Sequence, residues 1–103
     1  MSSFVLTPSA QQDLQRIQNY YLQEAGLRVA RQMLVEFVEA VRVVARTPGV
    51  GHKREDLAEN RPVLFWPMRD YLIIYKPETT PLEIITIARG SRDLSQIISR
   101  RGL

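Results

Sequence analysis

The sequence predicts an α+β fold: a short N-terminal strand and a two-helix antiparallel hairpin packed on an antiparallel sheet of three to four strands, then a short C-terminal helix. Two observations support this class. Apolar residues recur at helical spacing between residues 7 and 46, and three short β-branched and aromatic runs follow between residues 62 and 88. With 103 residues, 45% of them apolar, the chain can form one core, so we expect a single domain over residues 1–103.

The first predicted elements are a short strand and a helix. Residues 3–6 alternate weakly and indicate an edge strand. Thr7 is the expected N-cap of the helix, because Pro8 fits the first helical position, and Gly26 is the expected stop. Asp13 falls on the polar face, where we expect it to be solvated or ion-paired. The apolar stripe of this helix consists of Ala10, Leu14, Ile17 and Tyr21.

A second, longer helix is predicted from Leu27 to about Arg46. The connection is so short that the two helices must lie antiparallel. Thr47 and Pro48 end the second helix, because a residue before proline disfavours the helical conformation. Its apolar stripe consists of Ala30, Met33, Leu34, Phe37, Val38, Val41, Val44 and Ala45.

Three strands are predicted in the second half of the chain. Residues 49–61 are polar and contain glycine, so they are expected to form a loop. The strands are expected at 62–67, 71–76 and 82–88, with turns at 68–70 and 77–81. Such short connections favour an antiparallel meander, covered on one face by the helical hairpin.

The chain then enters a turn and a final helix. Gly90 allows a sharp turn, and Asp93 with Gln96 resembles a capping box. The helix that follows carries Leu94, Ile97 and Ile98. Because adjacent helical positions point in different directions, we expect one of the two isoleucines in the core and the other facing a partner.

The charge of the chain favours acidic or phosphate-bearing partners. The formal net charge is +3, and 12 of the 14 basic residues are arginine, whose planar guanidinium suits carboxylates and phosphates. Cysteine is absent, which excludes disulfides and cysteine-based zinc sites. Neither a membrane-spanning run nor a signal peptide is visible, so we expect a cytoplasmic protein without membrane contact. We also expect neither a metal nor a cofactor.

Four segments, in this order along the chain, resemble the sequence pattern of a known family: "LTPSAQQDLQRIQNYY", "TPGVGHKREDL", "RDYLIIYKP" and "LEIITIARGSRDL". The chain resembles the RelE/ParE superfamily of bacterial type II toxins, and more closely its ParE branch. This resemblance implies a cognate antitoxin, ParD-like or similar, whose acidic and amphipathic C-terminal segment wraps the toxin. It also implies a toxin–antitoxin complex that binds operator DNA through the antitoxin.

Two activities share this fold, so the resemblance leaves the function open. ParE-like members inhibit DNA gyrase by binding, so resemblance to this branch implies an inhibitor rather than an enzyme. The alternative is a RelE-like, ribosome-dependent mRNA endonuclease, in which His52, the one histidine, would be the acid or base, since arginine stays charged. A third possibility is a copy that has lost toxicity and only assists its antitoxin in repression.

The candidate binding residues follow from the resemblance and from the basic stretches 46–54 and 89–103. If these stretches meet in space, they form one basic surface for an acidic partner. The position before Gly90, often histidine in the family, is Arg89 here. The candidates for contact with the target or the antitoxin are Lys53, Arg54, Arg69, Arg89, Arg92, Ile97, Ile98, Arg100 and Arg101.

Several of these candidates also have a purely structural interpretation. Arg89 can lie over Trp66 or a tyrosine as a cation–π contact. Arg92 can pair with Asp93 or Glu83 on the surface. The neighbouring Arg100 and Arg101 can form a frayed basic tail at the end of the chain.

Overall fold

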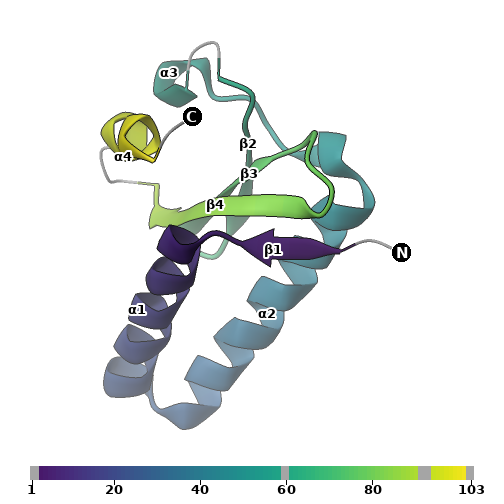
Figure 1. Cartoon of the computed structure of the whole chain (residues 1–103). Helices are drawn as coiled ribbons and strands as arrows, with labels where there is room; N and C mark the ends of the chain where they lie inside the picture. The colour runs from purple at the N-terminus through teal and green to yellow at the C-terminus, as the bar shows by residue number, and fades with distance from the viewer. Residues whose placement is uncertain (1–2, 59–60, 91–93, 102–103) are drawn as a thin grey trace.

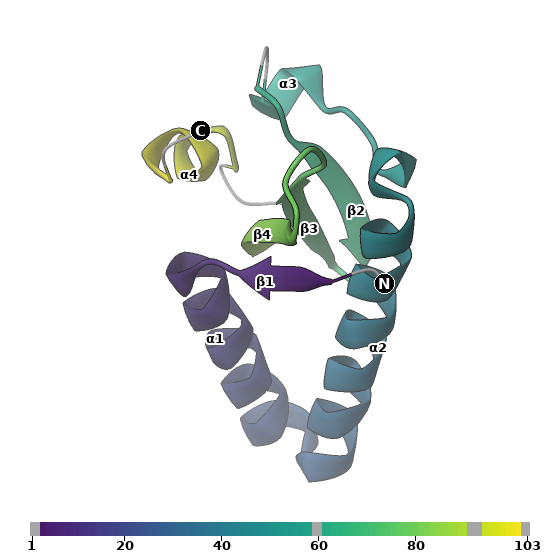
Figure 2. The same cartoon turned by 45° about the vertical axis from the view of Figure 1, so that its right-hand side comes forward.

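The structure is a computed structural model that describes residues 3–58, 61–90 and 94–101. Its first half is a helical hairpin, as predicted: α1 spans Pro8–Ala25 and α2 spans Leu27–Arg46. Figure 2 shows the two helices diverging from their tight connection toward the sheet. No helix in the described part of the chain is long and apolar enough to cross a membrane.

The ends of the helices are set by the residues predicted to set them. The Thr7 hydroxyl accepts a hydrogen bond from the Ala10 N–H at 3.2 Å, which caps α1. Gly26 has a φ of 89°, a conformation open to glycine, and it separates the helices. The buried residues of α2 all belong to the predicted stripe: Ala30, Met33, Phe37, Val41 and Val44.

Four strands form one sheet in the order β1-β4-β3-β2. They are β1 (Phe4–Leu6), β2 (Leu64–Met68), β3 (Tyr71–Lys76) and β4 (Leu82–Arg89). The last three form the predicted antiparallel meander, but β1 pairs parallel to β4. The sheet is therefore mixed, and the prediction of an antiparallel sheet was wrong at β1. No tight turn joins β1 to β4, so no local connection dictates their relative direction.

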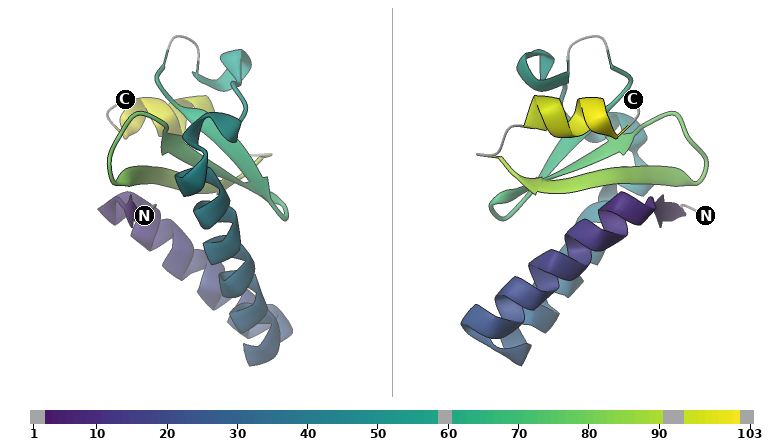
Figure 3. Two further views of the ribbon diagram at one scale, coloured as in Figure 1. Left: turned by 90° about the vertical axis from the view of Figure 1, so that its right-hand side faces the viewer. Right: turned by 60° about the vertical axis from the view of Figure 1, so that its left-hand side comes forward.

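Both faces of the sheet are covered. The hairpin α1–α2 packs on one face, over a core that includes Met33, Phe37, Ile73 and Ile84. The opposite face is covered by α3 (Glu55–Ala58) and α4 (Leu94–Arg100), as Figures 1 and 3 show. Helix α3 lies within the segment predicted as a loop. The apolar residues of this second core are Ala58, Val63, Phe65, Ile74, Ile85, Ala88, Leu94 and Ile98.

The outer edge of β2 is closed by two features. His52 pairs with Phe65, and the two residues exchange backbone hydrogen bonds of 2.8 Å. Pro67, predicted to end the strand, lies within it and is exposed, because an edge strand tolerates the missing N–H. The strand therefore continues to Met68, and the turn to β3 is only Arg69-Asp70.

Tyr75 fastens the segment after α2 to the sheet. Its buried hydroxyl donates to the Pro48 carbonyl at 2.6 Å and accepts from the Gly51 N–H at 3.0 Å. Burial raises the pKa of Tyr75 above its ordinary value. The backbone of Gly51 lies so close that an added Cβ would collide with the Tyr75 hydroxyl.

Replacing Gly51 with alanine is expected to lower the free energy of unfolding by about 1–3 kcal/mol, because the new methyl group has no space. Urea denaturation followed by circular dichroism measures the loss. Gly49→Ala is the matched control, since a Cβ at Gly49 would meet nothing within 4 Å, and it should leave stability unchanged. Equal stability of the two variants would contradict the expected collision.

Candidate binding surface

Arg89 lies at the end of β4 over two tyrosines. Its guanidinium carbon is 5.5 Å from the ring centre of Tyr20 and 5.7 Å from that of Tyr71. Contacts with the Tyr71 hydroxyl, and then the Tyr20 hydroxyl, raise the pKa of Arg89 further, so it is always charged. The predicted cation–π contact with a tyrosine is confirmed. Arg89 nevertheless remains exposed, so its charge is accessible to a partner.

Asp13 and Arg101 form a salt bridge between residues 88 positions apart. The Arg101 Nη1 and Nη2 atoms donate to the two Asp13 oxygens at 2.5 and 3.1 Å. Asp13 is ion-paired, which was one of the two predicted alternatives, but it is only 2% exposed, so its predicted place on the solvated polar face of α1 was wrong. The interpretation of Arg101 as part of a frayed tail was also wrong, because the salt bridge ties the end of α4 to α1.

The same two side chains close the edge of β4 beyond β1. Strand β1 ends at Leu6, opposite Ile84, and does not reach the residues of β4 that follow. There the Asp13 carboxylate accepts from the Ile87 N–H at 3.0 Å. Arg101 donates to the Ile85 carbonyl at 3.3 Å. The salt bridge thus provides the hydrogen bonds that a longer β1 would have made.

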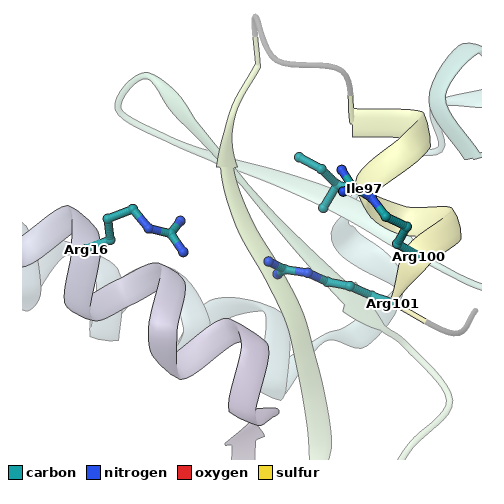
Figure 4. Close-up of a pocket in the computed structure, with 4 residues that line it drawn as sticks. All are labelled: Arg16, Ile97, Arg100 and Arg101. Atoms are coloured by element: carbon teal, nitrogen blue, oxygen red, sulfur yellow. The ribbon is translucent and has the colours of Figure 1, made fainter.

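Two depressions on this side of the molecule share Arg16 of α1 as a lining residue. Figure 4 shows Arg16 approaching β4 from one side and Arg101 approaching it from α4. The first depression is lined by Arg16, Ile97, Arg100 and Arg101. The second is lined by residues that include Arg16, Tyr20 and Arg89. We call this surface the arginine groove and define it by Arg16, Tyr20, Arg89, Ile97, Arg100 and Arg101.

The arginine groove is strongly basic. Four arginines line it, while the Asp13 carboxylate bonds chiefly to Arg101 and contacts Arg16 at 3.4 Å. Within the described part of the chain, neither Arg89 nor Arg100 contacts a carboxylate. The partly buried Ile97 and the 46% exposed Tyr20 add apolar surface beside these charges. The groove therefore suits an acidic segment that also carries apolar side chains.

The structure places the two isoleucines of α4 and the basic residues before α3, whereas Arg92 is not described. Ile98 is buried and Ile97 is partly buried beside the groove, so the prediction that one of the two lies in the core is confirmed, and the partner-facing role of Ile97 stays a prediction. Lys53 and Arg54 precede α3, which lies beside α4, and Arg54 pairs with Asp56 at 3.0 Å. Arg92 and the predicted capping residue Asp93 lie outside the described residues.

Arg69 connects the β2–β3 turn to both helices of the hairpin. Its side chain donates two hydrogen bonds to Glu36 of α2, at 2.7 and 2.8 Å, and lies over the Tyr21 ring of α1. The hydrogen bonds from Arg69, with a smaller contribution from Gln32, lower the pKa of Glu36 to about 2. Although Arg69 was predicted as a binding residue, its charge is paired within the chain.

The Glu36–Arg69 pair should make stability depend on pH. Because folding lowers the pKa of Glu36 from 4.5 to about 2, its contribution is present above pH 4.5 and is lost as the pH falls toward 2. Both side chains are about one-third exposed, so we expect only about 1 kcal/mol. Urea denaturation of the wild type and Glu36→Gln should differ at pH 6 and converge near pH 2. A difference that persists at pH 2 would contradict this assignment.

His52 stands apart from the arginine groove. Its exposed ring stacks on Trp66, with centres 6.0 Å apart, at the outer edge of β2. Three inter-strand spacings, about 14 Å, separate the His52 backbone, which pairs outside β2, from β4, which carries Arg89. Within residues 3–58, 61–90 and 94–101, no His, Asp and Glu side chains gather as metal ligands would.

Sequence reasoning missed Arg16 and Tyr20, which belong to the polar side of the predicted first helix. Their positions, with Asp13, follow the spacing i, i+3, i+7, which places them on one helical face. That face borders the apolar stripe, and it lies against β4 and α4. The position of Asp13 at the border of the apolar stripe was the available signal that this face is covered. Its partner Arg101 could not be found from the sequence of α1 alone.

The helical hairpin on one face of a mixed four-stranded sheet is an α+β fold that matches that of a ParE-like toxin. The chain belongs to the family described as ParE toxin of the type II toxin-antitoxin system, parDE, which it matches over residues 4–94. The fold is similar to a solved structure from the chromosomal ParDE toxin–antitoxin system of P. aeruginosa. The TM-score is 0.70 at 22% sequence identity, over 86% of this chain and 96% of that chain. Among curated proteins, no sequence matches.

Proposed function

We propose that this toxin inhibits DNA gyrase by binding it, and that a cognate antitoxin neutralises the toxin. The observation that carries the proposal is the arginine groove, where Arg89 and Arg100 contact no carboxylate among the residues that the structure describes. Gyrase inhibition is the activity that membership of the ParE family implies. The groove supplies a surface for such binding, with charge at its rim and apolar side chains between.

The arginines of the groove are suited to binding rather than to the proton transfers of RNA cleavage. Cleavage at a ribose 2′-hydroxyl needs groups that accept and donate protons beside the group that stabilises the phosphate charge. The arginines of the groove stay protonated and cannot exchange protons at neutral pH. His52 can exchange them, but it lies across the sheet from the groove.

The proposed antitoxin carries an acidic and amphipathic segment, because such a segment matches both the arginines and the apolar surface of the groove. In this proposal the two proteins meet in the cytoplasm, and the complex reaches operator DNA through the antitoxin. Neutralisation follows if the antitoxin covers the same arginines that contact gyrase.

Association with the antitoxin should slow markedly as salt rises, because opposite charges steer the encounter and salt screens them. We expect the association rate constant to fall by about tenfold between 50 and 500 mM NaCl, as measured by stopped flow. Arg100→Gln should flatten this dependence. A rate constant independent of salt would contradict an electrostatic docking surface.

The decisive test is supercoiling of relaxed plasmid by purified gyrase, with the toxin alone and with its antitoxin. We expect inhibition, or trapped cleaved plasmid, that the antitoxin reverses. Normal supercoiling at a large excess of folded toxin would overturn the proposal for that gyrase. Translating ribosomes with bound mRNA would then be the next target to test, with His52→Ala as the informative variant.

A further inference from the structure

Helix α4 supplies two members of the arginine groove, but little in its own sequence fixes its position. It spans only Leu94–Arg100, seven residues, too short to be stable as an isolated helix. Its inner face contributes two fully buried side chains, Leu94 and Ile98, to the second core. This burial sets which face of α4 points inward, but apolar contacts are not directional, so they define the slide of the helix along the sheet less sharply.

Directional contacts come from a long hydrogen bond of Arg61 to the Ser99 hydroxyl, at 3.4 Å, and above all from the salt bridge of Arg101. Arg101 directly follows α4 and donates to both Asp13 oxygens, to the Ile85 carbonyl and to the Thr86 hydroxyl. These acceptors come from α1 and from the edge of β4. A planar guanidinium that satisfies acceptors on two elements fits in one orientation, so the end of α4 is fixed relative to both.

Asp13 is the centre of this arrangement. It is buried, it lies one turn before Arg16 on α1, and it accepts a hydrogen bond from the Ile87 N–H as well as those from Arg101. It faces the sheet, whereas Arg16 faces the groove. Asp13 thus contacts β4 directly and the end of α4 through Arg101, while it is not among the residues that line the two depressions.

We propose that Asp13 is the positioning residue of the arginine groove. Through Arg101 it holds α4 so that Ile97 and Arg100 stand beside Arg16 and Arg89 and act as one binding surface. This inference rests on the proposed function only where binding of gyrase is the readout. The placement of α4 can be measured without any partner.

Hydrogen exchange of the full chain tests the placement of α4 directly. Asp13→Asn keeps a carbonyl oxygen for the Ile87 N–H but removes the charge that binds Arg101. We expect backbone amides of residues 94–101 to exchange at least tenfold faster in this variant, with α2 unchanged. Unchanged exchange in α4 would overturn the inference, whatever the gyrase assay shows.

The conservative variant separates positioning from a general loss of packing. Arg101→Lys keeps a positive charge but cannot donate to both Asp13 oxygens through a planar guanidinium, whereas Arg101→Gln keeps neither the charge nor that geometry. Exchange in α4 should be intermediate for Arg101→Lys and fastest for Arg101→Gln. Asp56→Asn is the matched control, because Asp56 also pairs with an arginine but is exposed, and it should exchange as the wild type does. Equal exchange in Asp13→Asn, Arg101→Lys, Arg101→Gln and Asp56→Asn would contradict a role for the salt bridge.

A double-mutant cycle connects the placement to binding. In the wild type, Arg100→Ala should raise the toxin concentration that half-inhibits gyrase by about tenfold. In the Asp13→Asn background, the same substitution should change it less than twofold, because α4 is already displaced. Full additivity would overturn the positioning role. If the wild type does not inhibit gyrase but α4 responds to Asp13→Asn, the proposed function fails and the positioning role stands.

Discussion

Replacing Asp13 with alanine is expected to lower the free energy of unfolding by about 3 kcal/mol. The substitution leaves the Ile87 N–H and the Arg101 guanidinium without their common acceptor in a buried site. The loss falls at the lower end of the range for broken buried pairs, because Arg101 is 23% exposed and can regain water.

Urea denaturation at neutral pH measures this loss. Arg16→Ala is the control, because Arg16 contacts the same carboxylate at 3.4 Å but is 63% exposed, and its removal should cost less than about 0.5 kcal/mol. Equal effects of Asp13→Ala and Arg16→Ala would mean that burial of the carboxylate carries no energetic weight. Asp13→Asn should lie between the two, because its amide oxygen still accepts from Ile87.

Under the proposed function, reversing two charges in the arginine groove should remove the inhibition of gyrase. With Arg16→Glu and Arg89→Glu combined, the half-inhibiting concentration is expected to rise by at least about a hundredfold, since each lost charged hydrogen bond contributes about 1.5–3 kcal/mol. Both side chains are exposed, so the fold should persist. Supercoiling of relaxed plasmid and arrest of growth on expression are the two readouts.

The matched control carries the same change of net charge elsewhere on the molecule. Arg28 and Arg31 are exposed residues of α2 that border a separate depression. Arg28→Glu with Arg31→Glu should retain inhibition, apart from a modest change that salt removes. If both double variants lose inhibition equally, net charge rather than the groove determines binding.

Local signals in the sequence were sufficient to predict the helical hairpin. Thr7, Pro8 and Gly26 specify the ends of α1 through hydrogen bonds and backbone conformations that involve only their neighbours. The meander of β2, β3 and β4 was predictable for the same reason, since short turns require antiparallel neighbours. These are the parts of the fold whose interactions lie close together in the sequence.

The groove was predictable only in part, because its residues meet through contacts that are distant in the sequence. Arg89, Ile97 and Arg100 were found near the end of the chain, but Arg16 and Tyr20 come from α1. The burial of Asp13 depends on Arg101, and neither residue alone indicates the other. The parallel direction of β1 likewise depends on how the whole sheet assembles.

The closed edge of β2 has a consequence for the behaviour of the protein at high concentration. A bare edge strand is a template for strands of other molecules and therefore a site of aggregation. Pro67 offers no N–H there, and His52 already occupies the backbone groups of Phe65. Proteins crowded together while the toxin is being made thus meet, on this side of the sheet, an edge with few free backbone groups, which disfavours extension of the sheet through β2.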